Sequence, residues 1–371
     1  MLLAERLDLV RGRRVGLVTH AAAVTPDLAL GAERLRAAGV QLAALFGPEH
    51  GITGAAAEGA SVAHGRDSAG VPVYSLYGAT REPTDEMLAG LDLLLFDMQD
   101  VGARYYTYLS TLLSVLRAAA RARLPLVVLD RPNPITGAAV EGPLVTPGYE
   151  SFVGAAPLPV RHGLTLGEAA GWLDATFGLG ADLTVVAMRG WRRSMWFDET
   201  GRLWVPTSPA MAHLTAAALY PGTCLLEGTN LSVGRGTALP FEICGAPWLD
   251  GEALAARLNA RGLPGVRFRP LRFVPLGSRF AGQECGGVQI HVLSRASLRP
   301  VALGLELVAA VRAQHPEAFG WEAEHFDRLI GGPAVREAIE GGVPADEIAA
   351  QWSAEEAAFD SARRQHLLYP A

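Results

Sequence analysis

Short apolar runs alternate with segments of helical periodicity through the first half of the chain, and this alternation restricts the fold more than any other feature. Strands are predicted at 15–18, 40–46, 71–77, 91–98, 126–129 and 183–188. Helices are predicted between them at 28–38, 84–89, 106–121 and 165–177. Strands that alternate with helices are typical of βαβ units. The sequence therefore predicts an α/β fold with a mostly parallel sheet.

The second part of the chain has a different sequence pattern. After about residue 220 it is loop-dense and polar, and a strand at 288–292 with helices at 303–312, 334–339 and 346–359 indicates a smaller α+β unit. A length of 371 residues fits two domains, and 50% hydrophobic residues supply an ample core. We therefore predict a first domain at 1–220 and a smaller C-terminal domain at 221–371 that contributes to the cleft.

Every basic side chain is an arginine, because the chain has no lysine. Schiff-base chemistry, pyridoxal phosphate anchoring and the Walker and kinase phosphate sites all use a lysine amine, so these classes are excluded. The 32 arginines are scattered among 38 acidic residues, and the net charge is −6. Without a basic stripe we expect no nucleic-acid partner, and a small or neutral ligand instead.

The cysteine spacing and the hydropathy of the chain bear on disulfides, zinc binding and membrane insertion. Cys224, Cys244 and Cys285 form no C-x-x-C pair, so neither a disulfide framework nor a zinc knuckle is expected. No apolar run is long enough to cross a bilayer. Charges at Glu5 and Arg6 interrupt the region where a signal peptide would be apolar. As written, the chain is expected to be cytoplasmic, or periplasmic or extracellular if an export signal has been removed.

Polar residues follow four of the predicted strands, at the edge where an open parallel sheet binds its ligands. They are His20 and the segments 47–51 (GPEHG), 97–104 (DMQDVGAR) and 130–134 (DRPNP). The Gly- and Ala-rich stretch 47–70 is too long for an ordinary connection. We expect it to be an active-site loop and the four segments to converge on one cleft.

Each carboxylate in these segments has a chemical and a structural interpretation. Glu49, at the rim of an apolar sheet, is suited to general acid catalysis, and it could equally cap a turn. Asp97 and Asp100 could stabilise charge in a site, but the nearby Arg104 favours a structural ion pair. Asp130 beside Arg131 has the same two interpretations.

The segment 161–168 begins a helix with Thr165 as its N-cap and Glu168 as the reciprocal residue of a capping box. His162, just before that helix, could face the cleft as a donor or be structural. The segment 227–237 (EGTNLSVGRGT) has the glycines of a phosphate-binding loop but no lysine. Arg235 and its neighbouring amides are better suited to a carboxylate or to hydroxyl groups.

The spacing of the histidines gives little support to a metal site. His20, His50, His64 and His162 could offer ligands beside carboxylates, but neither H-E-x-x-H nor H-x-H occurs. We expect no metal and no cofactor. The seven tryptophans could include sugar platforms, although each is more typical of a core position.

Eight ordered blocks resemble one family, the exo-β-N-acetylmuramidases of the NamZ type. The resemblance runs from about residue 10 to the C-terminal LLYP. The blocks are GPEHG at 47–51, PVYSLYG at 72–78, FDMQDVGARYYTY at 96–108, LDRPNP at 129–134, SFVG at 151–154, HGLTLGE at 162–168, LEGTNLSVGRGT at 226–237 and GAPW at 245–248.

This resemblance implies a Rossmann-like catalytic domain, a smaller C-terminal domain and hydrolysis that releases N-acetylmuramic acid from the non-reducing end of peptidoglycan fragments. It implies that Glu49 is the acid. A second carboxylate is expected among Glu227, Asp100, Glu168 and Asp130. Contacts to the sugar, including the lactyl carboxylate, are expected from His50, Arg104, Tyr106, Asp130, Arg131, Asn133, His162, Glu168, Asn230 and Arg235.

Two positions depart from the family pattern. Ala210 stands where relatives have asparagine after serine and proline, and Ala238 stands where an acidic residue often follows arginine, glycine and threonine. Two other functions compete with the glycosidase hypothesis. One is a non-catalytic muropeptide or sugar sensor, and the other is a metal-assisted hydrolase that uses the histidines. The oligomeric state is not predicted.

Overall fold

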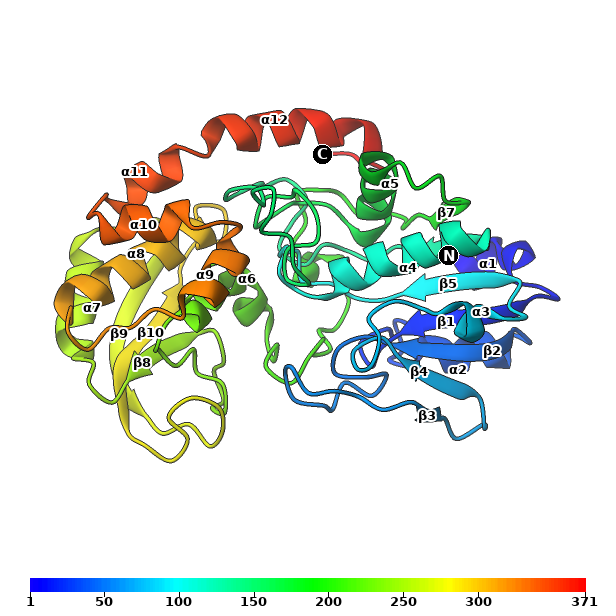
Figure 1. The fold of residues 1–371 in the computed structure, drawn as a ribbon, viewed down its shortest axis with the longest axis horizontal. Helices are drawn as coiled ribbons and strands as arrows, with labels where there is room; N and C mark the ends of the chain where they lie inside the picture. Colours follow the sequence, from blue (N-terminus) through cyan, green and yellow to red (C-terminus); the bar gives the residue numbers. More distant parts are fainter.

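The computed structural model describes residues 1–371 and places them in two units with a gap between their lower parts (Figure 1). The first unit is built on a seven-stranded sheet in the order β3-β4-β2-β1-β5-β6-β7. All neighbouring strands are parallel except the short β3, which is antiparallel to β4. Its elements are α1 (Leu2–Glu5), β1 (Arg14–Thr19), α2 (Gly31–Ala37), β2 (Gln41–Gly47), β3 (Gly65–Arg66), β4 (Pro72–Ser75), α3 (Asp85–Leu88), β5 (Leu93–Asp97), α4 (Tyr108–Ala122), β6 (Leu126–Leu129), α5 (Leu166–Phe177) and β7 (Leu183–Val186).

Strand β5 is apolar from Leu93 to Phe96 because both faces of the sheet are covered, and it ends in Asp97. Leu93 and Leu95 belong to a core of 12 residues that also contains Leu2 of α1 and Leu35 of α2. The alternate residues Leu94 and Phe96 belong to the main core with α4 and α5. Successive side chains of a strand point to opposite faces, so a continuous apolar run is what a central parallel strand requires.

The second unit has a three-stranded antiparallel sheet in the order β8-β10-β9, covered by helices. Its glycines Gly222 and Gly304 let α6 and α8 cross closely, since a side chain at either would collide with the other helix. The main core of 74 residues runs without interruption through both units. The elements are α6 (Leu214–Thr223), β8 (Ile243–Ala246), α7 (Gly251–Ala260), β9 (Val266–Phe273), β10 (Cys285–Val292), α8 (Pro300–Gln314), α9 (Ala323–Ile330), α10 (Ala334–Glu340), α11 (Ala345–Ala350) and α12 (Ser353–Arg363).

The end of the chain returns to the first unit. Helix α12 bridges the two units at the top of Figure 1, and Phe359 on it packs edge-to-face against Trp172 of α5. Arg363 then donates to the carbonyls of His162 and Gly163. Finally the Tyr369 hydroxyl donates to Asp130 at 2.5 Å. The last residues are therefore part of the structure around β6.

The predicted α/β architecture with a smaller second unit is confirmed, while several elements of the second unit were not predicted. The helix expected at 346–359 is two helices, α11 and α12, separated by Gln351 and Trp352. Elements α6, α7, α9, β8 and β9 have no counterpart in the sequence prediction. Residue 220, where we divided the chain, lies within α6. No helix is both long and apolar enough to span a bilayer.

Candidate active site

Glu49 lies in a sharp turn directly after β2. His50 has φ +70° and Gly51 has φ +72°, so two successive residues adopt the left-handed conformation. Such a conformation is costly for a residue with a side chain. The ring of His50 is held by a hydrogen bond between Nδ1 and the Ala56 carbonyl at 2.7 Å. This turn reverses the chain immediately after the Glu49 carboxylate.

Both oxygens of the Glu49 carboxylate have a defined donor. The Gly59 amide donates to Oε1 at 2.9 Å, and the Thr107 hydroxyl donates to Oε2 at 2.7 Å. Thr107 is the residue that precedes α4, and Gly59 belongs to the stretch 47–70. Glu49 is 9% exposed. Burial and then Glu49 raise the pKa of the Tyr77 hydroxyl, which places Tyr77 against the same carboxylate.

Asp100 is a second buried carboxyl, in the segment between β5 and α4. Its Oδ2 accepts from the Gly102 amide at 2.7 Å, while Oδ1 has no hydrogen-bond partner. Burial raises the pKa of Asp100 to about 7. An unpaired oxygen on a buried carboxyl is unusual in folded proteins. Near neutral pH this group is therefore poised between its protonated and ionised forms.

The His162 ring lies next to the Asp100 carboxyl. Its Nε2 lies 3.9 Å from Asp100 Oδ2 and has no hydrogen-bond partner. Its Nδ1 accepts from the Leu164 amide at 3.1 Å, so the neutral ring carries its proton on Nε2. Burial, followed by Arg363, lowers the pKa of His162 to about 3. The ring is therefore neutral at physiological pH, and it has no exposed surface, so its burial favours the structural interpretation over a sugar contact.

Two tyrosines connect the surroundings of the two carboxyls. The Tyr106 hydroxyl shares a hydrogen bond with Thr207 Oγ1, and the Tyr108 hydroxyl donates to the Thr207 carbonyl, both at 2.7 Å. Their rings meet edge-to-face at 4.7 Å. Burial is the main cause that raises the pKa of Tyr108, and both Glu49 and Asp100 add to it. Glu49 and Asp100 therefore approach the same buried side chain.

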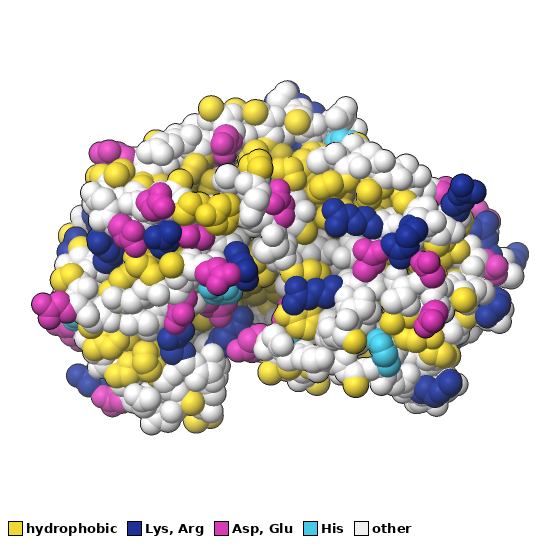
Figure 2. Space-filling view, in the orientation of Figure 1, with side chains coloured by type: hydrophobic (Ala, Val, Ile, Leu, Met, Phe, Trp, Pro, Cys, Tyr) yellow, Lys and Arg dark blue, Asp and Glu magenta, His cyan; other side chains and the backbone are white.

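The second unit contributes an ion pair to the gap between the units. Glu227 Oε1 accepts from Arg235 Nε at 2.5 Å, and the Arg235 guanidinium lies 4.9 Å from the centre of the Phe241 ring. Glu58, from the stretch 47–70 of the first unit, reaches Arg235 at 3.5 Å. A cavity of about 390 Å³ adjoins Glu227. Figure 2 shows charged side chains of both signs along the hollow between the units.

Arg104 does not have the role that we expected. It is completely buried, and its guanidinium donates to the carbonyls of Pro143, Leu158 and Leu329. It pairs with neither Asp97 nor Asp100. Asp97 instead pairs with Arg131 at 2.7 Å. The structure therefore corrects both predictions for Arg104, since a guanidinium enclosed by three carbonyls cannot contact a sugar.

Four further residues that we expected at the sugar are used by the fold. Asp130 accepts from the Arg131 and Gly167 amides and from the hydroxyls of Thr165 and Tyr369, and Glu168 forms the predicted capping box and pairs with Arg193. Asn133 bonds the carbonyl of Leu164 and the amide of Ile135. Asn230 bonds the carbonyl of Ala318 and the amide of Gly320. These partners occupy the side chains, so the structure favours a structural role for all four.

Comparison with known proteins identifies the family to which the chain belongs. A family model described as the N-terminal part of exo-beta-N-acetylmuramidase NamZ matches residues 15–215, and the model of its C-terminal part matches residues 218–369. The chain belongs to the NamZ family. The peptidoglycan beta-N-acetylmuramidase NamZ of Bacillus subtilis is 42% identical over 371 residues, which cover 99% of this chain and 90% of that protein.

Two crystal structures of DUF1343 family proteins from Bacteroides fragilis share the fold of this NamZ family member. One has a TM-score of 0.91 at 35% identity, covering 99% of this chain and 97% of that one. The other has a TM-score of 0.80 at 28% identity, covering 98% and 96%. The agreement extends over both units, so the two-unit arrangement is common to these relatives.

Several residues of the candidate site in this NamZ family member were not predicted. Thr107, Tyr108 and Tyr77 lie inside blocks that we compared with the family, but nothing in their spacing assigns them to Glu49. Thr207 comes from a segment far from Glu49 in sequence, and Glu58 lies in the stretch 47–70, where no pattern relates it to Arg235. The two departures lie apart: Ala210 is buried close to Thr207, and Ala238 is exposed. No group of three or more His, Cys, Asp and Glu side chains in the chain could hold a metal ion.

Proposed function

We propose that this chain is an exo-acting β-N-acetylmuramidase that hydrolyses the β-1,4 bond of a MurNAc residue at the non-reducing end of peptidoglycan fragments. Family membership and the name of the Bacillus subtilis relative support the reaction class. The observation that carries the site is Glu49, a nearly buried carboxylate whose two oxygens are fixed by Gly59 and Thr107 beside the gap between the units. Fixed carboxyls flanking a bond are what glycoside hydrolysis requires.

In the proposed reaction Glu49 gives its proton to the glycosidic oxygen while the bond from that oxygen to C1 of MurNAc breaks. Positive charge then develops on C1 and the ring oxygen. Water supplies the new hydroxyl at C1, and its proton restores Glu49. General acid catalysis of this kind contributes roughly 10²–10⁴-fold to the rate.

Asp100 is our choice for the second carboxyl. Its Oδ1 has no partner within the protein, whereas both oxygens of Glu227 face Arg235. In its ionised form Asp100 would stabilise the developing positive charge or orient the acetamido group of the sugar.

Arg235 is our candidate for the lactyl carboxylate of MurNAc. It is 16% exposed, lies over Phe241 and already holds two carboxylates, those of Glu227 and Glu58. Glu58 comes from the other unit and is 46% exposed, so it is the weaker of the two partners. A substrate carboxylate could take its place on the guanidinium.

Release of free N-acetylmuramic acid from the MurNAc-β-1,4-GlcNAc disaccharide tests the function. We expect release by the unmodified protein, unaffected by a chelator, and a loss of roughly 10²-fold or more in Glu49→Gln with little change in disaccharide binding. Glu86→Gln, an exposed residue of α3, is the matched control and should behave as the parent does.

Other outcomes would redirect the assignment. Turnover that survives Glu49→Gln would move the acid role to another carboxyl. Binding of the disaccharide without release by the unmodified protein would favour the sensor hypothesis, and a loss of release on chelation would favour the metal-assisted one. Comparing Asp100→Asn with Glu227→Gln identifies the second catalytic carboxyl. Only substitution of the catalytic residue should reduce kcat far more than it alters KM.

A further inference from the structure

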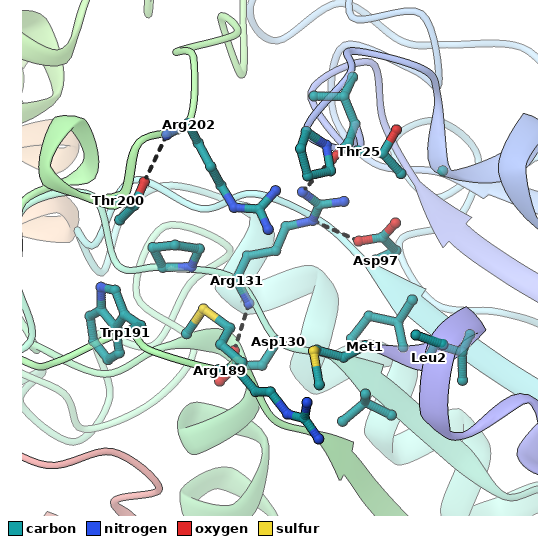
Figure 3. A pocket seen from close by; sticks show the side chains of 18 of the residues that line it. Met1, Leu2, Thr25, Asp97, Asp130, Arg131, Arg189, Trp191, Thr200 and Arg202 are labelled. Atoms are coloured by element: carbon teal, nitrogen blue, oxygen red, sulfur yellow. Dashed lines mark hydrogen bonds and ion pairs between the residues drawn. The ribbon is translucent and has the colours of Figure 1, made fainter.

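A second cavity lies in the first unit, at the carboxyl ends of β6 and β7. It has a volume of about 610 Å³ and is lined by residues of the segments 1–4, 24–35, 129–132 and 186–202, together with Asp97. Glu49, Thr107, Tyr108 and Asp100 are not among its lining residues. Figure 3 shows this cavity with Arg131 and Arg202 extending toward each other inside it.

The guanidinium groups of Arg131 and Arg202 have nitrogens without a hydrogen-bond acceptor. Arg131 donates from Nε to Asp97 at 2.7 Å and from Nη1 to the Val24 carbonyl at 3.0 Å, and its Nη2 has no partner. The Arg202 guanidinium has no hydrogen bond or ion pair with any residue of the chain. Arg202 as a residue is exposed, and the partial burial of its side chain, followed by the nearby Arg131, lowers its pKa. Two guanidinium groups thus face one cavity, and only that of Arg131 is paired with a carboxylate, that of Asp97.

The other charged side chains of the cavity already have partners. Arg34 pairs with Asp27, and Arg189 pairs with Glu5. Asp130 is enclosed by the amides and hydroxyls described above, and Glu199 accepts from the Trp196 amide at 2.7 Å. Among the arginines that line the cavity, only Arg202 therefore has a guanidinium without a partner, and the Nη2 of Arg131 is also unpaired. Guanidinium groups with free nitrogens are the typical ligands of phosphate and carboxylate groups.

The remaining wall of the cavity is apolar. Leu129, Met188, Trp191 and Met195 contribute to it. Small-molecule sites commonly combine such an apolar wall with a few polar groups that fix the orientation of the ligand. The volume lies within the range of about 300–1,000 Å³ of such sites and would accept a sugar-sized body attached to the anionic group.

We propose that this cavity binds a small organic anion, whose phosphate or carboxylate group lies between Arg131 and Arg202 and whose body packs against the apolar wall. The site is separate from the catalytic residues, so the proposal does not depend on the proposed function. A phosphorylated sugar and a sugar acid share the required chemistry, and the experiment distinguishes them.

Calorimetric titration of the full chain in a buffer without phosphate or carboxylate tests the proposal. The probes are inorganic phosphate, glucose 6-phosphate, N-acetylmuramic acid and, as an uncharged reference, glucose. We expect at least one of the three anions to bind and glucose not to bind. Arg202→Gln should weaken that binding by about 10- to 100-fold, since it removes a charged hydrogen-bond donor.

Two controls make the result specific. Arg192→Gln changes the net charge equally at an exposed position outside the cavity, and it should leave the affinity within about twofold of the parent. Arg235→Gln, which removes the guanidinium proposed to hold the lactyl carboxylate in the cleft, should retain anion binding, and this separates the cavity from the cleft. Equal losses in Arg202→Gln and Arg192→Gln, an unchanged affinity in Arg202→Gln, or no binding of any anion at millimolar concentration would overturn the proposal.

Discussion

Three carboxyl groups are buried so deeply that they hold their protons far above the usual range. Burial raises the pKa of Asp100 to about 7, of Asp130 to about 6 and of Glu141 to about 7. In the unfolded chain such groups lose their protons near pH 4. Between about pH 4 and 7 these three carboxyls therefore bind more protons in the folded protein than in the unfolded chain, and their contribution to the free energy of unfolding falls as the pH rises through this window. His20 and His162, whose pKa burial lowers to about 3, contribute in the opposite direction.

Asp100→Asn tests this linkage at one residue. The amide is always neutral and its oxygen can still accept from Gly102, so we expect the variant to lose less stability than the parent between pH 4 and 7. The difference corresponds to about 1.4 kcal/mol for each unit by which the pKa is raised. Urea unfolding at a series of pH values measures it. Parallel stability curves for parent and variant would contradict the raised pKa of Asp100.

For single residues, the sequence predicts where a side chain lies in the fold more readily than which groups it contacts. Glu49 and Asp100 could be placed at the cleft because they follow strands whose carboxyl ends meet at one edge of the sheet. The capping box of Thr165 and Glu168 could be predicted because its partners are three residues apart. Arg104 could not be assigned, because the three carbonyls that enclose its guanidinium belong to residues 39 to 225 positions away.

The stretch 47–70 is the element that connects the Glu49 carboxylate to the second unit. Its residues Glu58 and Gly59 are adjacent, and they contact Arg235 and Glu49 respectively. Movement of Glu58 away from Arg235 would therefore affect the amide that holds Glu49. In the proposed reaction, substrate binding at Arg235 would be coupled to the position of Glu49 through the peptide that joins Glu58 and Gly59.

Glu58→Gln should lower KM for the MurNAc disaccharide, because it removes the carboxylate that competes for Arg235. The ion pair is half exposed, so its loss is worth at most about 1 kcal/mol, and the expected decrease in KM is up to roughly fivefold. Steady-state kinetics with Glu33→Gln, an exposed residue of α2, as the control measures it. A higher KM in Glu58→Gln would mean that Glu58 itself contacts the sugar.

Elements of the first unit were more predictable than those of the second for a physical reason. Central parallel strands are buried on both faces and form continuous apolar runs, as in β5. Strand β9 alternates arginines with apolar residues and contains Pro270, which obscures its pattern. Proline is tolerated there because β9 lies at the edge of its sheet. Strand β8 has four residues, too few to establish a period.

On the scale of the whole molecule, the main core and the returning C-terminal segment make the two units one structure. Tyr369 joins the last residues to both β6 and β7, since its hydroxyl donates to Asp130 and accepts from the Met188 amide at 3.0 Å. The amphipathic pattern of 346–359 indicates a buried helix face, but no local pattern specifies that the chain after it returns to β6.

Tyr369→Phe should destabilise the protein by about 1–3 kcal/mol, because Asp130 and the Met188 amide both lose a buried partner. One thermal transition, lowered by roughly 2–8 °C, is the expected result for a molecule with a continuous core. Tyr149→Phe is the control, since the Tyr149 hydroxyl has no hydrogen bond with the chain. Two separate transitions in the parent protein would contradict the description of the units as one cooperative structure.

The hydrogen bond between Asp130 and Tyr369 also determines when the first unit can be completed during synthesis. The two residues are 239 positions apart. At roughly 5–20 residues per second, a ribosome needs on the order of 10–50 seconds to proceed from one to the other. Throughout that interval the nascent sheet lacks the tyrosine that closes its edge at β6 and β7. The part of the protein that is translated first is therefore among the last to reach its final structure.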